Sequence, residues 1–135
     1  MIPKESMKIF HMRLRGMMVM LILQFVLGIT LATIVSFDGD GKPPLPHIIV
    51  LVPHVLLALG LFANAVYIVI VTKRNNSVIK KLARYGLAAI TGAIIGGIIT
   101  VLGPSHEGGS FLMGLCFLFA FVDYGVWFLR FPVLS

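Results

Sequence analysis

The sequence predicts an all-α fold, an integral membrane bundle of four transmembrane helices. Three observations predict it. Of the 135 residues, 59% are hydrophobic and 12% are charged, and that charged share is about half of what a soluble domain carries. The mean hydropathy is +1.03. The apolar residues gather in four long runs, approximately residues 16–37, 48–72, 85–103 and 111–129.

Each apolar run is long enough to cross a membrane as a helix. Crossing the hydrocarbon core takes about 20 helical residues, and backbone polar groups in lipid must be satisfied within the segment. A soluble helical core is unfavourable because too little polar chain remains to cover four such runs. The length also leaves no room for a separate soluble domain of ordinary size. We therefore expect residues 1–135 to form a single transmembrane domain.

The segments between the runs predict the orientation. Residues 38–44 and 104–109 are short, rich in turn formers and contain acidic side chains, whereas residues 73–84 are polar and basic. Ten of the eleven Lys and Arg residues lie in the N-terminal arm, in this central segment or at the C-terminal end. Because basic loops stay on the cytoplasmic side, we expect a multi-pass protein of the cell membrane with both termini in the cytoplasm.

The net charge of +6 points to lipid rather than to nucleic acid. The basic residues flank apolar runs, so their expected partner is the anionic inner leaflet, and no nucleic-acid partner is expected. Within the central basic segment, three apolar residues predict a short amphipathic stretch at the membrane interface: Val78, Ile79 and Leu82. The single cysteine, Cys116, excludes an internal disulfide.

Small and polar residues at a spacing of four predict where helices pack. The first run carries Gln24, Gly28, Ala32 and Ser36, and the third run carries Ala88, Gly92, Gly96 and Thr100. Such ridges let helix backbones approach closely in lipid. The second and fourth runs share Leu-Phe-Ala followed by Tyr, as Leu61-Phe62-Ala63 with Tyr67 and as Leu118-Phe119-Ala120 with Tyr124. Two parallel-repeat hairpins or chance similarity between apolar helices would both give this pattern.

Ionisable residues at membrane depth are costly, so His54 is a candidate functional residue. It follows His47 by seven residues, nearly two helical turns, which puts both imidazoles on one helix face about 10 Å apart. Pro53 withdraws a backbone donor and favours an opening beside His54. One reading of His54 is a ligand for haem or a metal, or a quinone contact. The other is a neutral imidazole hydrogen-bonded to a neighbouring helix.

His106, in the second outer loop, extends the candidate cofactor-binding set to three histidines. His47, His54 and His106 could approach one another at the outer end of the second helix. Carboxylates near them would complete a divalent-metal site, with His54 as its intramembrane ligand. The candidate carboxylates are Asp38, Asp40 and Glu107. Nothing in the spacing demands this site.

Asp123 is the second ionisable residue at membrane depth, with Asn64 and Gln24 as neutral companions. It lies seven residues before Arg130, hence about 10 Å inside the inner boundary. As a functional group it would relay protons or bind a cation. As a structural group it would pair with Arg84 or Asn64, or accept a hydrogen bond from Tyr67. Both readings turn its side chain toward the bundle interior.

Two stretches carry a family resemblance. They read Gln24-Phe25-Val26-Leu27-Gly28-Ile29-Thr30 and His54-Val55-Leu56-Leu57-Ala58-Leu59. The chain resembles the haem A synthase family here, whose four-helix units carry Gln-x-x-Leu-Gly-x-x-Thr-like and His-Leu-Leu-Leu-Ala patterns. The resemblance covers roughly a third of the chain and implies a haem with His54 as an axial ligand. The family's second histidine, in a Glu-x-x-His-Arg context, has no equivalent, and Phe111 stands at the position corresponding to His54.

Three functions remain open at this point. The first is a haem-associated protein linked to a respiratory chain, with His54 on the iron and His106 or a second chain opposite. The second is a non-enzymatic accessory subunit that packs against another membrane protein or a second copy of itself. The third is a small transporter or channel built from several copies around Asp123, Asn64 and Thr100. No catalytic motif names a reaction.

Overall fold

The computed structural model describes residues 4–34, 45–73, 77–102 and 106–130, and they form four helices. The helices are α1 (Lys4–Ile34), α2 (Leu45–Thr72), α3 (Ser77–Leu102) and α4 (His106–Arg130). Each contains a segment of 24 or 25 residues long and apolar enough to cross a membrane. The predicted all-α, four-helix membrane fold is therefore confirmed, and the chain is a multi-pass membrane protein.

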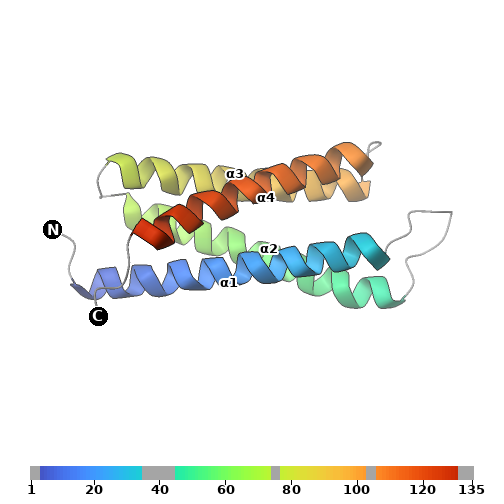
Figure 1. Ribbon diagram of the computed structural model, residues 1–135, viewed down its shortest axis with the longest axis horizontal. Helices are drawn as coiled ribbons and strands as arrows, with labels where there is room; N and C mark the ends of the chain where they lie inside the picture. The colour runs from blue at the N-terminus through green and yellow to red at the C-terminus, as the bar shows by residue number, and fades with distance from the viewer. Residues whose placement is uncertain (1–3, 35–44, 74–76, 103–105, 131–135) are drawn as a thin grey trace.

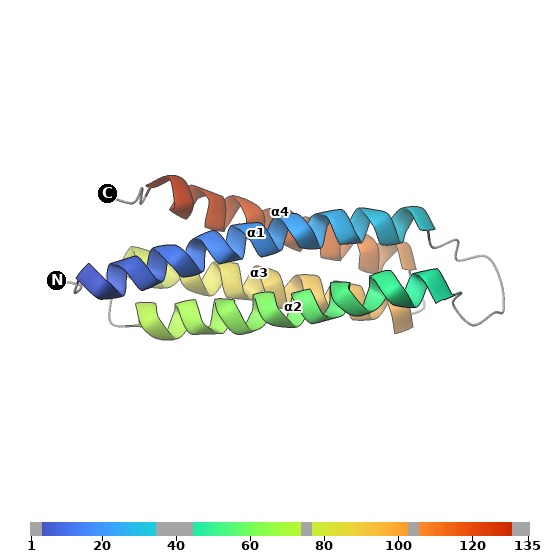
Figure 2. The same ribbon diagram turned by 90° about the horizontal axis from the view of Figure 1, so that it is seen from below.

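The helices form an up-and-down ring in chain order. Each packs against the next, and α4 closes the ring against α1, while the diagonal pairs make no contact among the described residues. Figures 1 and 2 show that α1 begins and α4 ends at the same end of the bundle, beside the α2–α3 junction. We call this the terminal end. The starts of α2 and α4 lie at the opposite end.

The bundle has a thin core and an apolar exterior. The core cluster consists of Leu14, Met17, Leu21, Leu61, Ala65, Ile68, Ala83, Ile90, Ala120, Tyr124 and Trp127. Large apolar side chains also cover the outside, among them Ile49, Phe111 and Leu129 at 65%, 72% and 77% exposure. A helix that is apolar all round belongs in a core or in a membrane. Because the core is too small to bury these apolar side chains, the helices are suited to lipid as their surroundings.

The helices begin earlier than the apolar runs. The first begins at Lys4 rather than near residue 16, and the third at Ser77 rather than near residue 85. Hydropathy marks the stretch that crosses lipid, whereas Lys, Arg, Met and Leu continue a helix beyond it at little cost. Val78, Ile79 and Leu82, expected in an interfacial stretch, belong to α3, where Ile79 and Leu82 pack against the core cluster and Val78 is exposed. The expected helix ends at residues 35–37 and 103 lie outside the described residues.

Glycines bring the backbones of α3 and α4 nearly into contact. A Cβ atom on Gly96 would lie 2.6 Å from the backbone nitrogen of Met113, and one on Gly109 would lie 2.5 Å from that of Thr100. On Gly92 it would lie 2.7 Å from Sγ of Cys116. The predicted ridge residues Gly92, Gly96 and Thr100 therefore lie at this interface.

The ridge leaves the interface at its other end. Ala88 is exposed and does not lie at the α3–α4 interface. At that end of the interface Gly86 lies against the ring of Tyr124 instead. A spacing of four residues drifts by about 40° around a helix at each step, so four such residues cannot all face one neighbour. On α1 the same drift leaves Ala32 exposed, while Gln24 and Gly28 face α2. Ser36 lies outside the described residues.

The two hairpins pack in different registers. Gly28 and Gly92 occupy corresponding ridge positions, but Gly28 lies against His54 and Gly92 lies against Cys116. Aligned on the shared Leu-Phe-Ala sequence, Cys116 corresponds to Leu59, which is exposed. The α1–α2 pair therefore does not repeat the backbone contact of α3 and α4.

Gly96→Ala should destabilise the bundle, because the added methyl group meets backbone that no rotamer change can move. Gly114→Ala is the matched control, since its Cβ would meet nothing within 4 Å. Both variants gain the same helix propensity. Overpacking should leave Gly96→Ala about 1–3 kcal/mol less stable than the control in unfolding from detergent micelles. Equal stability of the two variants would contradict the close approach of α3 and α4.

Candidate functional site

His54 forms a hydrogen bond with Gln24 across the α1–α2 interface. The two Nε2 atoms are 3.1 Å apart. An amide nitrogen only donates, so Nε2 of His54 accepts and the imidazole carries its proton on Nδ1. Nδ1 of His54 and Oε1 of Gln24 are buried and have no hydrogen-bond partner among the described residues. This contact is the neighbouring-helix hydrogen bond that one reading of His54 anticipates.

The ring of His54 packs within the α1–α2 interface. The ring lies against Gly28, whose Cβ would be 3.5 Å from Cε1 of His54. Neither of the two hollows described below is lined by His54. No group of three His, Cys, Asp or Glu side chains in the described part of the chain is placed to hold a metal ion. Around His54 the described residues therefore offer no three-ligand metal site.

The remaining members of the predicted metal set cannot be placed as ligands. His47 lies in the first turn of α2 and His106 is the first residue of α4. Their backbones are thus at the same end of the bundle, opposite the terminal end, and their side chains lie outside the described residues. Asp38 and Asp40 also lie outside the described residues, and Glu107 is exposed.

Asp123 is half-buried between α3 and α4 rather than in the centre of the bundle. Its Oδ2 atom lies 2.8 Å from where a Cβ on Gly86 would be, and it has no hydrogen-bond partner among the described residues. Asp123 also lines a hollow of about 530 Å³ on the outer face of these two helices, together with Tyr85, Cys116 and Phe119. The rest of that wall is aliphatic. We call this hollow the acidic hollow.

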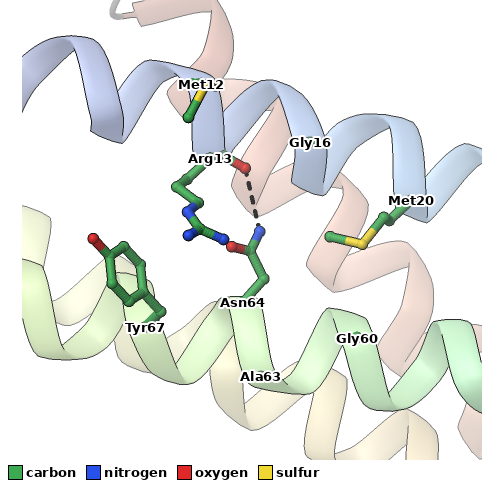
Figure 3. A pocket seen from close by; sticks show the side chains of 8 residues that line it. All are labelled: Met12, Arg13, Gly16, Met20, Gly60, Ala63, Asn64 and Tyr67. Atoms are coloured by element: carbon green, nitrogen blue, oxygen red, sulfur yellow. Dashed lines mark hydrogen bonds between the residues drawn. The ribbon is translucent and has the colours of Figure 1, made fainter.

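Two of the three partners expected for Asp123, Asn64 and Tyr67, make contacts elsewhere. Asn64 donates from Nδ2 to the backbone oxygen of Arg13, 3.2 Å away, and lies 3.9 Å from Sδ of Met17. Tyr67 lies under the guanidinium of Arg13, 4.7 Å from carbon Cζ to the ring centroid. Both contacts join α1 to α2 and are visible in Figure 3.

Arg13 is a site residue that sequence reasoning did not single out. It lines a hollow of about 630 Å³ between α1 and α2 with Asn64, Tyr67 and several small residues. We call this hollow the basic hollow. In the sequence Arg13 looks like part of a basic N-terminal arm. The arm consists of residues that favour a helix, and the helix continues through it. This continuation places Arg13 opposite Asn64.

The polar groups do not form one path through the chain. Thr100 donates to the carbonyl oxygen of Gly96 and lies near Ser110, close to the end opposite the terminal end. Asn64 lies between α1 and α2, and Asp123 lies on the outer face of α3 and α4. A conducting path around these three residues would therefore need several copies of the chain.

His54→Leu and Gln24→Leu should each lower stability, because each leaves one buried polar group without its partner. The double variant should cost less than the sum of the single changes, with a coupling of about 0.5–2 kcal/mol typical of interhelical hydrogen bonds in membranes. The monomer purified from haem-replete membranes should be colourless. A Soret band that His54→Leu abolishes, or fully additive effects on stability, would contradict the structural role of His54.

Comparisons with known proteins add no family to this description. No protein-family model matches the chain, and no curated protein and no solved structure matches it. The bundle, its two hollows and the hydrogen bond between Gln24 and His54 are therefore the observations from which a function must follow.

Proposed function

We propose that this chain is a non-enzymatic accessory subunit that packs against another membrane protein through the outer face of α3 and α4. The observation that carries the proposal is the carboxyl group of Asp123 in the acidic hollow. Its Oδ2 atom is buried without a hydrogen-bond partner among the described residues. Ionisable groups at membrane depth normally pair with another group. A partner helix that supplies a basic, amide or hydroxyl side chain would pair with this carboxyl group from the hollow.

The shape of this face also favours a helix as its occupant. Tyr85, Phe119 and Val122 line the acidic hollow and are exposed, while Ala89 leaves room between them. Helices associate in lipid through van der Waals packing and interhelical hydrogen bonds, and small residues allow close approach. An apolar hollow with a single acceptor offers both contributions.

The separation of the polar residues favours packing over catalysis. His54, Asn64 and Asp123 lie in different places in the bundle, and the first two are bonded to groups of α1. Groups that cooperate in a proton-transfer step must lie within hydrogen-bond reach of one reacting centre. An accessory role needs no such convergence.

We place the protein in the cell membrane with the terminal end facing the cytoplasm. Arg15, Lys80, Lys81 and Arg130 belong to helix segments at that end and Lys73 directly follows α2 there, whereas Glu107 is at the other end. This distribution follows the positive-inside rule. Tags on both termini should be cleaved by protease in inverted vesicles and protected in intact cells.

Asp123→Leu should dissociate the chain from its partner. Native electrophoresis of host membranes in mild detergent should show the wild type in a larger assembly and Asp123→Leu at the size of the single chain. Glu107→Gln is the control, since it removes an exposed carboxyl of the same helix outside the hollow. Removing an unpaired carboxyl should leave the isolated bundle at least as stable, so unfolding curves separate dissociation from misfolding.

Two results would contradict the accessory role. One is a wild-type protein that runs as a single chain at native expression levels. The other is Asp123→Leu remaining in the assembly. A photocrosslinker in place of Phe119 should reach the partner, and one in place of Ile22 on α1 should not. Crosslinks between two copies would make the assembly a homo-oligomer instead.

A haem-associated role is the second candidate, favoured by one observation. Nδ1 of His54 is buried and has no partner among the described residues, and it becomes a free ligand atom when the Gln24 amide turns so that Nε2–H of His54 donates to Oε1. Because one chain supplies a single imidazole there, such a role needs a ligand from a second chain. A Soret band that is present in the intact assembly and lost on dissociation would support it, and a colourless assembly would exclude it.

A further inference from the structure

The basic hollow lies on the face of the bundle formed by α1 and α2, away from the acidic hollow. It encloses about 630 Å³ and is lined by three polar residues, Arg13, Asn64 and Tyr67, among apolar and small ones. Figure 3 shows the guanidinium of Arg13 and the amide of Asn64 lying between the two helices. The partner proposed for the acidic hollow does not cover the α1–α2 face. The polar residues of the basic hollow must therefore have a different ligand.

Among the described side chains, no carboxylate lines the hollow beside the guanidinium of Arg13. The described acidic side chains, Asp123 and Glu107, are on α4 and do not line it. The next acidic residue along α1 is Glu5, about 12 Å away along the helix axis. Its contact with the face of the Tyr67 ring leaves the planar N–H donors available at the edge. Such a fork matches the oxygens of a phosphate or carboxylate group.

Asn64 adds a second, opposite requirement. It is 7% exposed, and its Nδ2 is already bonded to the backbone of Arg13. Its Oδ1 atom is buried and has no partner among the described residues. A buried acceptor left without a hydrogen bond is unfavourable, so a donor at this position stabilises the folded chain. The occupant of the hollow should therefore present an anionic group to Arg13 and a hydrogen-bond donor to Asn64.

The position of the hollow suits the head of a lipid. Arg13 lies four residues inside the apolar span that begins at Ile9, hence about 6 Å from its edge. Toward the membrane centre the wall is made by Gly16, Gly60 and Met20. A Cβ on Gly16 would meet nothing within 4 Å. The small residues thus leave a groove beside the helices in which an acyl chain can lie.

We propose that the basic hollow binds one anionic phospholipid whose headgroup carries a hydroxyl group. The phosphodiester accepts hydrogen bonds from Arg13, and a headgroup hydroxyl donates to Oδ1 of Asn64. One acyl chain lies along Gly16 and Gly60. Basic pockets between membrane helices at the cytoplasmic side are suited to anionic headgroups. Phosphatidylglycerol has this chemistry, whereas phosphatidylcholine has no net charge and no hydroxyl donor.

Native mass spectrometry of the full-length protein in detergent, titrated with defined lipids, tests the proposal. We expect one retained phosphatidylglycerol, bound at least about tenfold more tightly than phosphatidylcholine, as a charged hydrogen bond contributes. Phosphatidylmethanol keeps the charge but lacks the hydroxyl groups. It should bind about two- to tenfold more weakly than phosphatidylglycerol, because one neutral hydrogen bond is lost.

Variants separate the site from general charge attraction. Arg13→Gln should weaken phosphatidylglycerol binding at least about tenfold, while Arg15→Gln removes an equal charge from a residue that does not line the hollow and should leave binding unchanged. Gly16→Leu places a side chain in the groove at a position where an added Cβ meets nothing within 4 Å, and it keeps the guanidinium. Gly16→Leu should weaken phosphatidylglycerol binding as well. If Arg13→Gln does not fold, Gly16→Leu still tests the proposal.

Three outcomes would overturn the proposal. The first is equal retention of phosphatidylglycerol and phosphatidylcholine. The second is equal binding by the Arg15→Gln and Gly16→Leu variants. The third is displacement of phosphatidylglycerol by an equal concentration of inorganic phosphate, which would assign the hollow to a soluble anion.

Discussion

The bundle has to hold together in a solvent as apolar as its own side chains. Lipid gives no hydrophobic drive for one helix to join another, so close packing and hydrogen bonds between helices carry the association. The two hairpins meet this constraint differently. In α3 and α4, glycines at 96 and 109 bring backbone against backbone. In α1 and α2, hydrogen bonds join the helices, one between Gln24 and His54 and one between Asn64 and the backbone of Arg13.

This difference accounts for the two hollows. A backbone-close pair of helices leaves little room between them for a large side chain, so Asp123 is half-buried and opens onto the outer face beside Phe119. The pair held by polar contacts stays further apart at its small residues, Gly16 and Gly60, and leaves a groove beside Arg13. One hollow carries an acceptor and the other a cation, on faces formed by different helix pairs. Those charges are the reason we propose a protein partner at the first and a lipid at the second.

The sequence was sufficient for the fold and for part of the packing. Four apolar runs long enough to span a membrane are compatible with one fold class, a bundle of transmembrane helices. Gly92 and Gly96 were recognisable as packing residues because small residues in membrane helices mostly serve close packing. Helix starts were missed because hydropathy does not report helix propensity, and Arg13 was missed with them. The pairing of Gln24 with His54 and the outward opening beside Asp123 depend on the register between helices. Spacing within one helix does not contain that register.

The central claim is that lipid is the solvent of the outer apolar surface. Spin labels at Leu23, Leu56, Ile98 and Leu118, one on each helix and all exposed, test it after Cys116→Ala removes the native thiol. Reconstituted in bilayers, all four should collide frequently with oxygen, which concentrates in lipid, and rarely with a water-soluble nickel complex. Preferential collision with the nickel complex at these positions would show water around the bundle and contradict the account.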